Sequence, residues 1–403
     1  MLRKKQIFDG SSRRFEIDAL RGFAIVGIFL YHSVTQFNFP STFTQTNPVL
    51  TATDSFITRL SYLLLAGKMF GIFALLFGYT TYLQNEKPAS RGKYVYAVRM
   101  IILLLFGLIN SLFFPDGDIL VLYALIGILM LPFVHLKLAA LLTISILLLV
   151  QPVQLYHLIM AANDTGYTLP VSRSAVLKSE IHNVIMQGNF LQVMKTNLLL
   201  GVPASLTWEF ESGRIFQAAG LFIIGMLIRK KGIFRTKVNQ KKFWKNIMIL
   251  FTCLAAIVYA LKFFYFNNLP VSTFKTAVYT IAVLWLNTIG TLLIVTVFTF
   301  LYLLNKGKAF HPLTYLGRMS LTNYIAQSIL GAFIFSPFGF NFANTRGITY
   351  SIIVTCCLLL FQLILSRAWL LKHAKGPLEH LWAYLTHIFT DNKKLVTKEI
   401  QKI

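Results

Sequence analysis

The feature that most constrains this chain is a series of ten apolar runs of roughly 20 residues. They lie at about 20–37, 60–83, 97–114, 119–134, 138–158, 214–228, 246–266, 277–304, 313–336 and 347–371. A helix of about 20 residues crosses a bilayer, where only helices and closed barrels satisfy their backbone polar groups. Charged residues make up 13% of the chain, against about 25% in soluble domains, which excludes an ordinary soluble enzyme. The sequence predicts an all-α fold, a polytopic membrane helical bundle with about ten transmembrane helices.

The basic residues predict how this bundle is oriented. With the N-terminus inside, 29 of the 38 Lys and Arg residues fall in inside segments and seven fall outside. This bias follows the positive-inside rule and predicts both termini in the cytoplasm, N-in and C-in. The anionic inner leaflet of the lipid bilayer accounts for the formal net charge of +24, so we expect no nucleic acid as a partner.

We expect one continuous membrane domain at 19–371, between a cytoplasmic N-terminal segment at 1–18 and a cytoplasmic C-terminal tail at 372–403. An outer segment at about 159–213 interrupts it, either as an interfacial helix or as a plain connection. No cleavable signal peptide is visible. The three cysteines lie inside apolar runs, and the histidines are scattered, so no disulfide framework and no metal site are predicted.

The first span carries three candidate catalytic residues, Asp18, Arg21 and His32. Eleven residues make three helical turns, which puts Arg21 and His32 on one face, about 16 Å apart along the axis. Ionisable groups in spans are costly and therefore indicate function, and this spacing suits a long donor with an anionic head, such as acyl-coenzyme A. The alternatives are that Arg21 snorkels and pairs with Asp18, and that His32 is a packing histidine.

A polar cavity between spans one, two, three and nine is the predicted substrate site. Its candidate binding residues are Lys68, Asn110, Asp116, Asp118, Arg214, Arg318, Asn323 and Gln327. Each has a structural alternative. Lys68, about eight residues into the second span, could snorkel outward, Asp118 could cap the fourth span, and the amides of the ninth span could bond between helices. Glu209 and Glu211, which precede Arg214, are interpreted as an exposed interfacial pair rather than as acid/base groups.

Five blocks in register resemble the YeiB-like family of bacterial inner-membrane proteins, whose domain is of unknown function. They are Ile17–Ile28, Phe73–Gly78, Asp116–Leu120, Leu316–Tyr324 and Gly376–Trp382. The resemblance runs from about residue 16 to 387 and implies a multi-pass protein of the bacterial cell membrane. It also implies similarity to transmembrane acyltransferases, among them the heparan-α-glucosaminide N-acetyltransferase of lysosomes. Arg21 and His32 look like the first-helix pattern of the acyltransferase-three family, whose histidine is functional, although many YeiB-like chains carry Asn at that place.

The predicted function is acyl transfer across the membrane by an acyl-coenzyme A-dependent acyltransferase. A cytoplasmic donor would dock near Arg21, and His32 would act as a base or carry the acyl group toward an extracytoplasmic acceptor, a glycan or a lipid-linked sugar. No tightly bound cofactor is expected. A transporter or exporter of an anionic solute that uses Lys68 and Arg21 is the runner-up, and a non-catalytic envelope protein is the third hypothesis. The sequence predicts no particular oligomeric state.

Overall fold

The structure, a computed structural model, describes residues 14–35, 37, 47–85, 90–114, 118–187, 189–234, 240–342 and 347–390. Within these ranges every regular element is a helix, which confirms the predicted all-α fold. The helices are α1 (Phe15–Thr35), α2 (Pro48–Leu64), α3 (Lys68–Gln84), α4 (Ser90–Ser111), α5 (Ile119–Met130), η1 (Leu131–His135), α6 (Leu138–Leu149), α7 (Pro152–Asn163), α8 (Arg173–Gln187), α9 (Phe190–Thr196), η2 (Asn197–Gly201), α10 (Val202–Glu211), α11 (Arg214–Lys230), α12 (Gln240–Phe264), η3 (Phe266–Asn268), α13 (Thr273–Leu304), α14 (His311–Arg318), α15 (Ser320–Phe335), α17 (Ile348–Lys372) and α18 (Pro377–Thr390).

Many of these helices are long and apolar enough to cross a membrane. Among the described residues there are six such candidates, namely α1, the joined α2–α3, α4, α12, α13 and α17. Two bent pairs, α6 with α7 at 48° and α9–α10 with α11 at 75°, raise the count to eight if each pair is one span. α5 and α15 are shorter apolar helices. The chain is a helical membrane protein, and the count of ten spans and the inward termini stay predictions.

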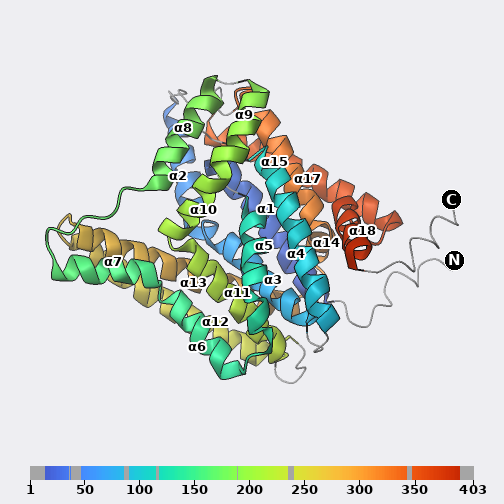
Figure 1. The fold of residues 1–403 in the computed structure, drawn as a ribbon, viewed down its shortest axis with the longest axis horizontal. Coiled ribbons are helices and arrows are strands. Elements are labelled where there is room, and N and C mark those ends of the chain that lie inside the picture. Colours follow the sequence, from blue (N-terminus) through green and yellow to red (C-terminus); the bar gives the residue numbers. More distant parts are fainter. Residues whose placement is uncertain are drawn as a thin grey trace.

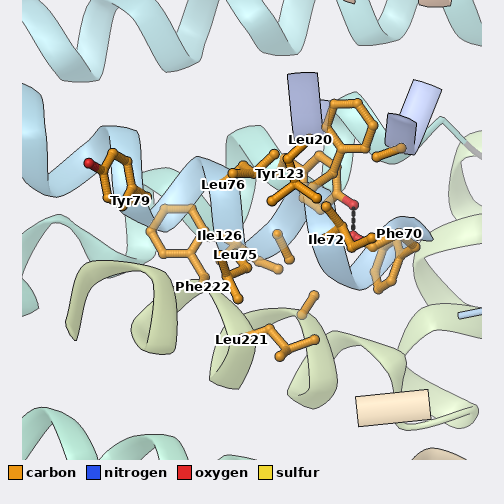
Figure 2. Close-up of a cluster of buried hydrophobic side chains, with 14 of the residues drawn as sticks. Leu20, Phe70, Ile72, Leu75, Leu76, Tyr79, Tyr123, Ile126, Leu221 and Phe222 are labelled. Carbon is orange, nitrogen blue, oxygen red and sulfur yellow. Dashed lines mark hydrogen bonds between the residues drawn. The ribbon is translucent and has the colours of Figure 1, made fainter. Parts of the chain in front are cut away.

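The centre of the bundle is built from α1, α3, α5 and α11 (Figure 1). Leu75 from α3, Phe222 from α11 and Tyr123 from α5 are fully or almost fully buried together (Figure 2). The Tyr123 hydroxyl donates a 2.6 Å hydrogen bond to the backbone oxygen of Phe70, which satisfies a polar group in this apolar core (Figure 2). This core packs α3 and α5 against α11.

Glycines bring pairs of helix backbones into direct contact. A Cβ atom at Gly78 of α3 would lie 1.7 Å from a backbone oxygen of α11, and one at Gly225 of α11 would lie 1.9 Å from a backbone oxygen of α3. In the same way, a Cβ atom at Gly22 of α1 would lie 2.0 Å from a backbone oxygen of α14, and one at Gly317 of α14 would lie 1.8 Å from a backbone oxygen of α1. Small residues let membrane helices approach closely, so these glycines fix the two crossings.

The predicted second span is broken between α2 and α3. Gly67 adopts a left-handed conformation with φ 69°, and α3 begins at Lys68. The Lys68 ammonium donates to the backbone oxygens of Tyr62 and Ala66, both at 3.2 Å, and to Oδ1 of Asn287 at 3.0 Å. A break inside a membrane helix leaves carbonyls that need donors, and Lys68 supplies them. Lys68 is therefore the first residue of α3, at a turn inside the joined α2–α3 candidate span.

The segment predicted at 159–213 contains the helices α8, η2 and α10 as well as the short α9. Ile181 and Ile185, whose spacing predicts a helix, are buried in α8 and form a small separate core with Val193 and Ala204. At the other side of the bundle, α12 packs along α13, and α7 lies beside α13 (Figure 1). The segment 159–213 is thus a folded part of the bundle that can supply walls to a site.

Candidate functional site

A cavity of about 280 Å³ lies where α1, the α2–α3 break, α8, α10 and the start of α11 meet. We call it the polar cavity, and its polar and aromatic lining residues are Tyr31, His32, Thr35, Tyr62, Lys178, Trp208, Glu209 and Arg214. The lining differs from the predicted one, because α4 and α15 contribute none of it while α8 and α10 do. The cavity therefore combines the first span with the segment 159–213.

His32 sits near the C-terminal end of α1 and is 8% exposed. Its ring lies 4.7 Å from the Phe114 ring and 6.1 Å from the Phe37 ring, measured between centroids. His32 lines the polar cavity, and its ring forms no hydrogen bond with any residue that the structure describes. Aromatic rings thus hold the imidazole by packing, and its nitrogens are available to a molecule in the cavity.

Glu209 is the carboxylate of the cavity. It is 6% exposed, and its Oε2 has no hydrogen-bond partner within the described ranges. The interpretation of Glu209 as half of an exposed pair is therefore wrong. A buried carboxylate without a partner is costly, which is typical of a functional site.

The neighbouring Glu211 has a structural role. Its carboxylate accepts hydrogen bonds from the hydroxyls of Ser172 and Ser174, at 2.8 and 2.6 Å, and from the backbone N–H of Arg173 at 2.9 Å. These bonds join the start of α8 to the end of α10. Glu211 thereby positions α8, which carries Lys178 to the cavity wall.

Arg214 is the first residue of α11 and follows Gly213, whose φ of 75° turns the chain sharply. The Arg214 guanidinium carbon lies 5.0 Å from the centroid of the Trp208 ring, and the Lys178 ammonium lies 4.8 Å from the same centroid. Within the described ranges no carboxylate oxygen lies within 4.0 Å of the Arg214 guanidinium. Two cations beside one carboxylate favour an anionic ligand.

Asp18 and Arg21 lie elsewhere. Arg21 Nη1 and Asp18 Oδ1 are 3.4 Å apart, which is the i,i+3 pair that the sequence offers as an alternative. Neither residue lines the polar cavity, and Arg21 is three turns of α1 from His32. The structure brings Asp18 and Arg21 together with each other and not with His32.

Asn110 and Asp118 are buried and hold helix contacts. The Asn110 amide donates to the Ser328 hydroxyl at 3.1 Å, and Asp118 caps α5 by accepting from the backbone N–H of Leu120 at 2.9 Å. Neither lines the polar cavity. Asp116 lies outside the described residues.

The predicted binding residues near the ninth apolar run connect helices. Arg318 donates to a backbone oxygen in the turn before α18 at 3.1 Å. Asn323 donates to the Ser366 hydroxyl at 3.1 Å, and Gln327 donates to the Gln362 side-chain oxygen at 2.9 Å. The contacts of Asn323 and Gln327 join α15 to α17, as the interhelical alternative predicts. Of the eleven predicted site residues, His32 and Arg214 share the polar cavity.

Two further cavities adjoin this site. A groove of about 910 Å³ between α12, α13 and the α2–α3 break shares Tyr62 and Arg214 with the polar cavity and also contacts Lys68. We call it the apolar groove. A narrow slot of about 40 Å³, lined by Ser320, Tyr324 and Trp382 among others, shares Ile119 with the polar cavity.

Comparison with known proteins defines a class for this fold and site. Residues 13–179, which include His32, match the catalytic domain of heparan-alpha-glucosaminide N-acetyltransferase. The chain is therefore similar to a membrane acyltransferase over the part that supplies α1, α3 and the start of α8.

The particular family follows from the rest of the chain and from relatives. Residues 228–389 match the family described as "Protein of unknown function (DUF418)". The chain is 25% identical to protein YeiB of Escherichia coli over 93% of its length and 96% of that protein. It is 24% identical to protein YxaH of Bacillus subtilis over 92% of its length and 94% of that protein. These matches confirm the predicted resemblance to the YeiB-like family.

Proposed function

We propose that this protein is a membrane acyltransferase of the bacterial cell membrane and that His32 performs the chemistry. The observation that carries the proposal is the His32 imidazole, which lines the polar cavity without a hydrogen bond to any described residue. Its place in the stretch similar to an N-acetyltransferase catalytic domain supports the same role.

The reaction that fits this site is attack of an acceptor hydroxyl or amine on a thioester. His32 accepts a proton from the acceptor's hydroxyl or amine, while the acceptor's oxygen or nitrogen bonds to the thioester carbonyl carbon. The carbon–sulfur bond then breaks, and the protonated imidazole returns the proton to the departing thiolate. Arg214 holds an anionic group of the acceptor, because its guanidinium faces the cavity beside Trp208.

The donor in this proposal is acyl-coenzyme A, which binds as a substrate and not as a resident cofactor. In this proposal the acyl arm approaches through the narrow slot that shares Ile119 with the polar cavity, and this slot, at about 40 Å³, must widen to admit it. Arg21, about 16 Å from His32 along α1, lies at the predicted cytoplasmic end, where the anionic head would dock.

The test uses purified protein in nanodiscs with labelled acetyl-coenzyme A and an envelope extract as the source of acceptor. His32→Asn keeps a hydrogen-bond donor and an acceptor but cannot take a proton near neutral pH. We expect it to lower acyl transfer about 10²–10⁴-fold while acetyl-coenzyme A binding is unchanged. His135→Asn, which alters an exposed histidine in η1, is the matched control and should keep full transfer.

Full transfer by the His32→Asn protein would exclude proton transfer at that position. Uptake or efflux of an anion by proteoliposomes, with no acetyl-coenzyme A binding, would instead favour the transporter hypothesis. A protein that neither binds acetyl-coenzyme A nor moves an anion would favour a non-catalytic envelope role.

A further inference from the structure

The apolar groove has the composition of a site for an amphipathic molecule. Its wall is largely aliphatic, with Leu63, Ala256, Val283, Leu286, Leu293 and Ile294 among the lining residues. Along α13 it extends from Tyr279 to Ile294, about 22 Å at 1.5 Å per residue. The hydrocarbon of one leaflet is about 15 Å thick, half of a 30 Å core, so a lipid chain fits along this wall.

Three basic residues also contact the groove, and they are not equivalent. The three N–H donors of Lys68 are used by Tyr62, Ala66 and Asn287, so this cation serves the helix break. The Lys262 ammonium lies 4.3 Å from the centroid of the Tyr279 ring, and neither this ammonium nor the Arg214 guanidinium donates a hydrogen bond to a described residue. The groove therefore joins an aliphatic wall to two cations with available donors.

Such cations are costly in a membrane unless they meet an anion. Lys262 and Tyr279 lie at one end of the groove's extent along α13, and Arg214 lies where the groove meets the polar cavity. A molecule with a long hydrocarbon chain and an anionic head matches both features. A free anion would leave the aliphatic wall uncovered, and an uncharged lipid would leave the cations without a partner.

We propose that the apolar groove binds a membrane lipid with an anionic head group. The chain lies along α12 and α13, and the phosphate contacts Lys262 and Arg214. Because Arg214 also lines the polar cavity, the head group lies next to His32 and Glu209. That this lipid is the acyl acceptor rests on the proposed function, whereas the lipid site itself does not.

The experiment measures lipid binding by native mass spectrometry of the full chain in dodecyl maltoside. Dioleoyl phosphatidylglycerol is compared with dioleoyl phosphatidylcholine, which has the same chains and no net charge. We expect the anionic lipid to bind more tightly, and Lys262→Gln to weaken its binding about fivefold, the contribution expected of one basic residue near an anionic lipid. Lys242→Gln, at the other end of α12, is the control and should change nothing.

A second pair of variants tests the chain. Ala256→Trp fills the groove and should weaken the binding of both lipids, while Ile257→Trp, on the exposed face of the same helix, should not. The thermal unfolding midpoint of each variant shows whether it folds, and the two pairs test the proposal independently.

Equal binding of the two lipids, or displacement of phosphatidylglycerol by millimolar inorganic phosphate, would overturn the proposal. So would unchanged binding in both Lys262→Gln and Ala256→Trp. Lipid binding without acyl transfer would instead support the lipid site and contradict the proposed function, so the two failures are distinguishable.

Discussion

At the scale of single residues, the buried polar groups of this bundle have two kinds of surroundings. Lys68, Asn323 and Gln327 use their donors on helix breaks and helix contacts. His32 and Glu209 line the polar cavity. No described residue forms a hydrogen bond with the His32 ring or with Oε2 of Glu209. The first group is expected to govern stability and the second to govern activity.

Lys68 gives the clearest stability prediction. Lys68→Met should lower the free energy of unfolding by about 3 kcal/mol, because hydrogen bonds to a charged group contribute about 1.5–3 kcal/mol each and the freed carbonyls are buried. Thermal unfolding in detergent measures this. Lys242→Met, which alters an exposed lysine of α12, is the control, and equal midpoints for the two variants would contradict a structural role.

Arg21 tests the donor end of the first span. Its pair with Asp18 is partly exposed and should contribute at most about 1 kcal/mol, so Arg21→Ala should fold nearly normally. If Arg21 clamps a phosphate of the donor, Arg21→Ala weakens acetyl-coenzyme A binding and Arg21→Lys restores only part of it, since lysine lacks the bidentate fork. Isothermal titration measures this, with Arg59→Ala as an exposed control. Full recovery in Arg21→Lys would point to snorkelling alone.

At the scale of elements, the glycine crossings are the tightest contacts in the bundle. Gly78→Ala places a Cβ atom 1.7 Å from a backbone oxygen of α11, so α3 and α11 must separate. Overpacking of this kind costs about 1–3 kcal/mol, and we expect a clearly lower thermal unfolding midpoint. Gly92→Ala in α4, where the nearest atom is 4.0 Å away, should be neutral or slightly stabilising. Similar unfolding midpoints for Gly78→Ala and Gly92→Ala would show that the α3–α11 crossing can accommodate a Cβ atom.

Elements also show what could be predicted from the sequence. Each of the ten apolar runs is mainly helical, because hydrophobic length is encoded locally, but the runs 60–83, 138–158 and 313–336 are each divided between two helices. The break before Lys68 could not be predicted, because the Lys68 ammonium that donates to its carbonyls also donates to Oδ1 of Asn287, which is distant in sequence. The walls of the polar cavity could not be predicted either, because they come from segments that are distant in sequence. Nothing local distinguishes Lys178 in α8, or the different surroundings of Glu209 and Glu211, until α8, α10 and α1 are assembled.

At the scale of the whole molecule, orientation decides which cavity faces which side. If the positive-inside rule holds, the polar cavity and the Lys262 end of the apolar groove open toward the outer half of the membrane, while α18 and the slot lie toward the cytoplasm. A donor from the cytoplasm and an acceptor from the outer leaflet would then meet at His32 from opposite sides.

That arrangement is tested by topology. A reporter fused after Lys245 should be cytoplasmic, because eight basic residues cluster between Arg229 and Lys245, and one fused near Asp164 should be outside. Alkaline phosphatase and green fluorescent protein fusions at both sites report the two compartments with opposite signals, so each controls the other. A cytoplasmic Asp164 would reverse the bundle, place the polar cavity on the donor side and remove the reason for transfer across the membrane, although the chemistry at His32 could still occur on one face.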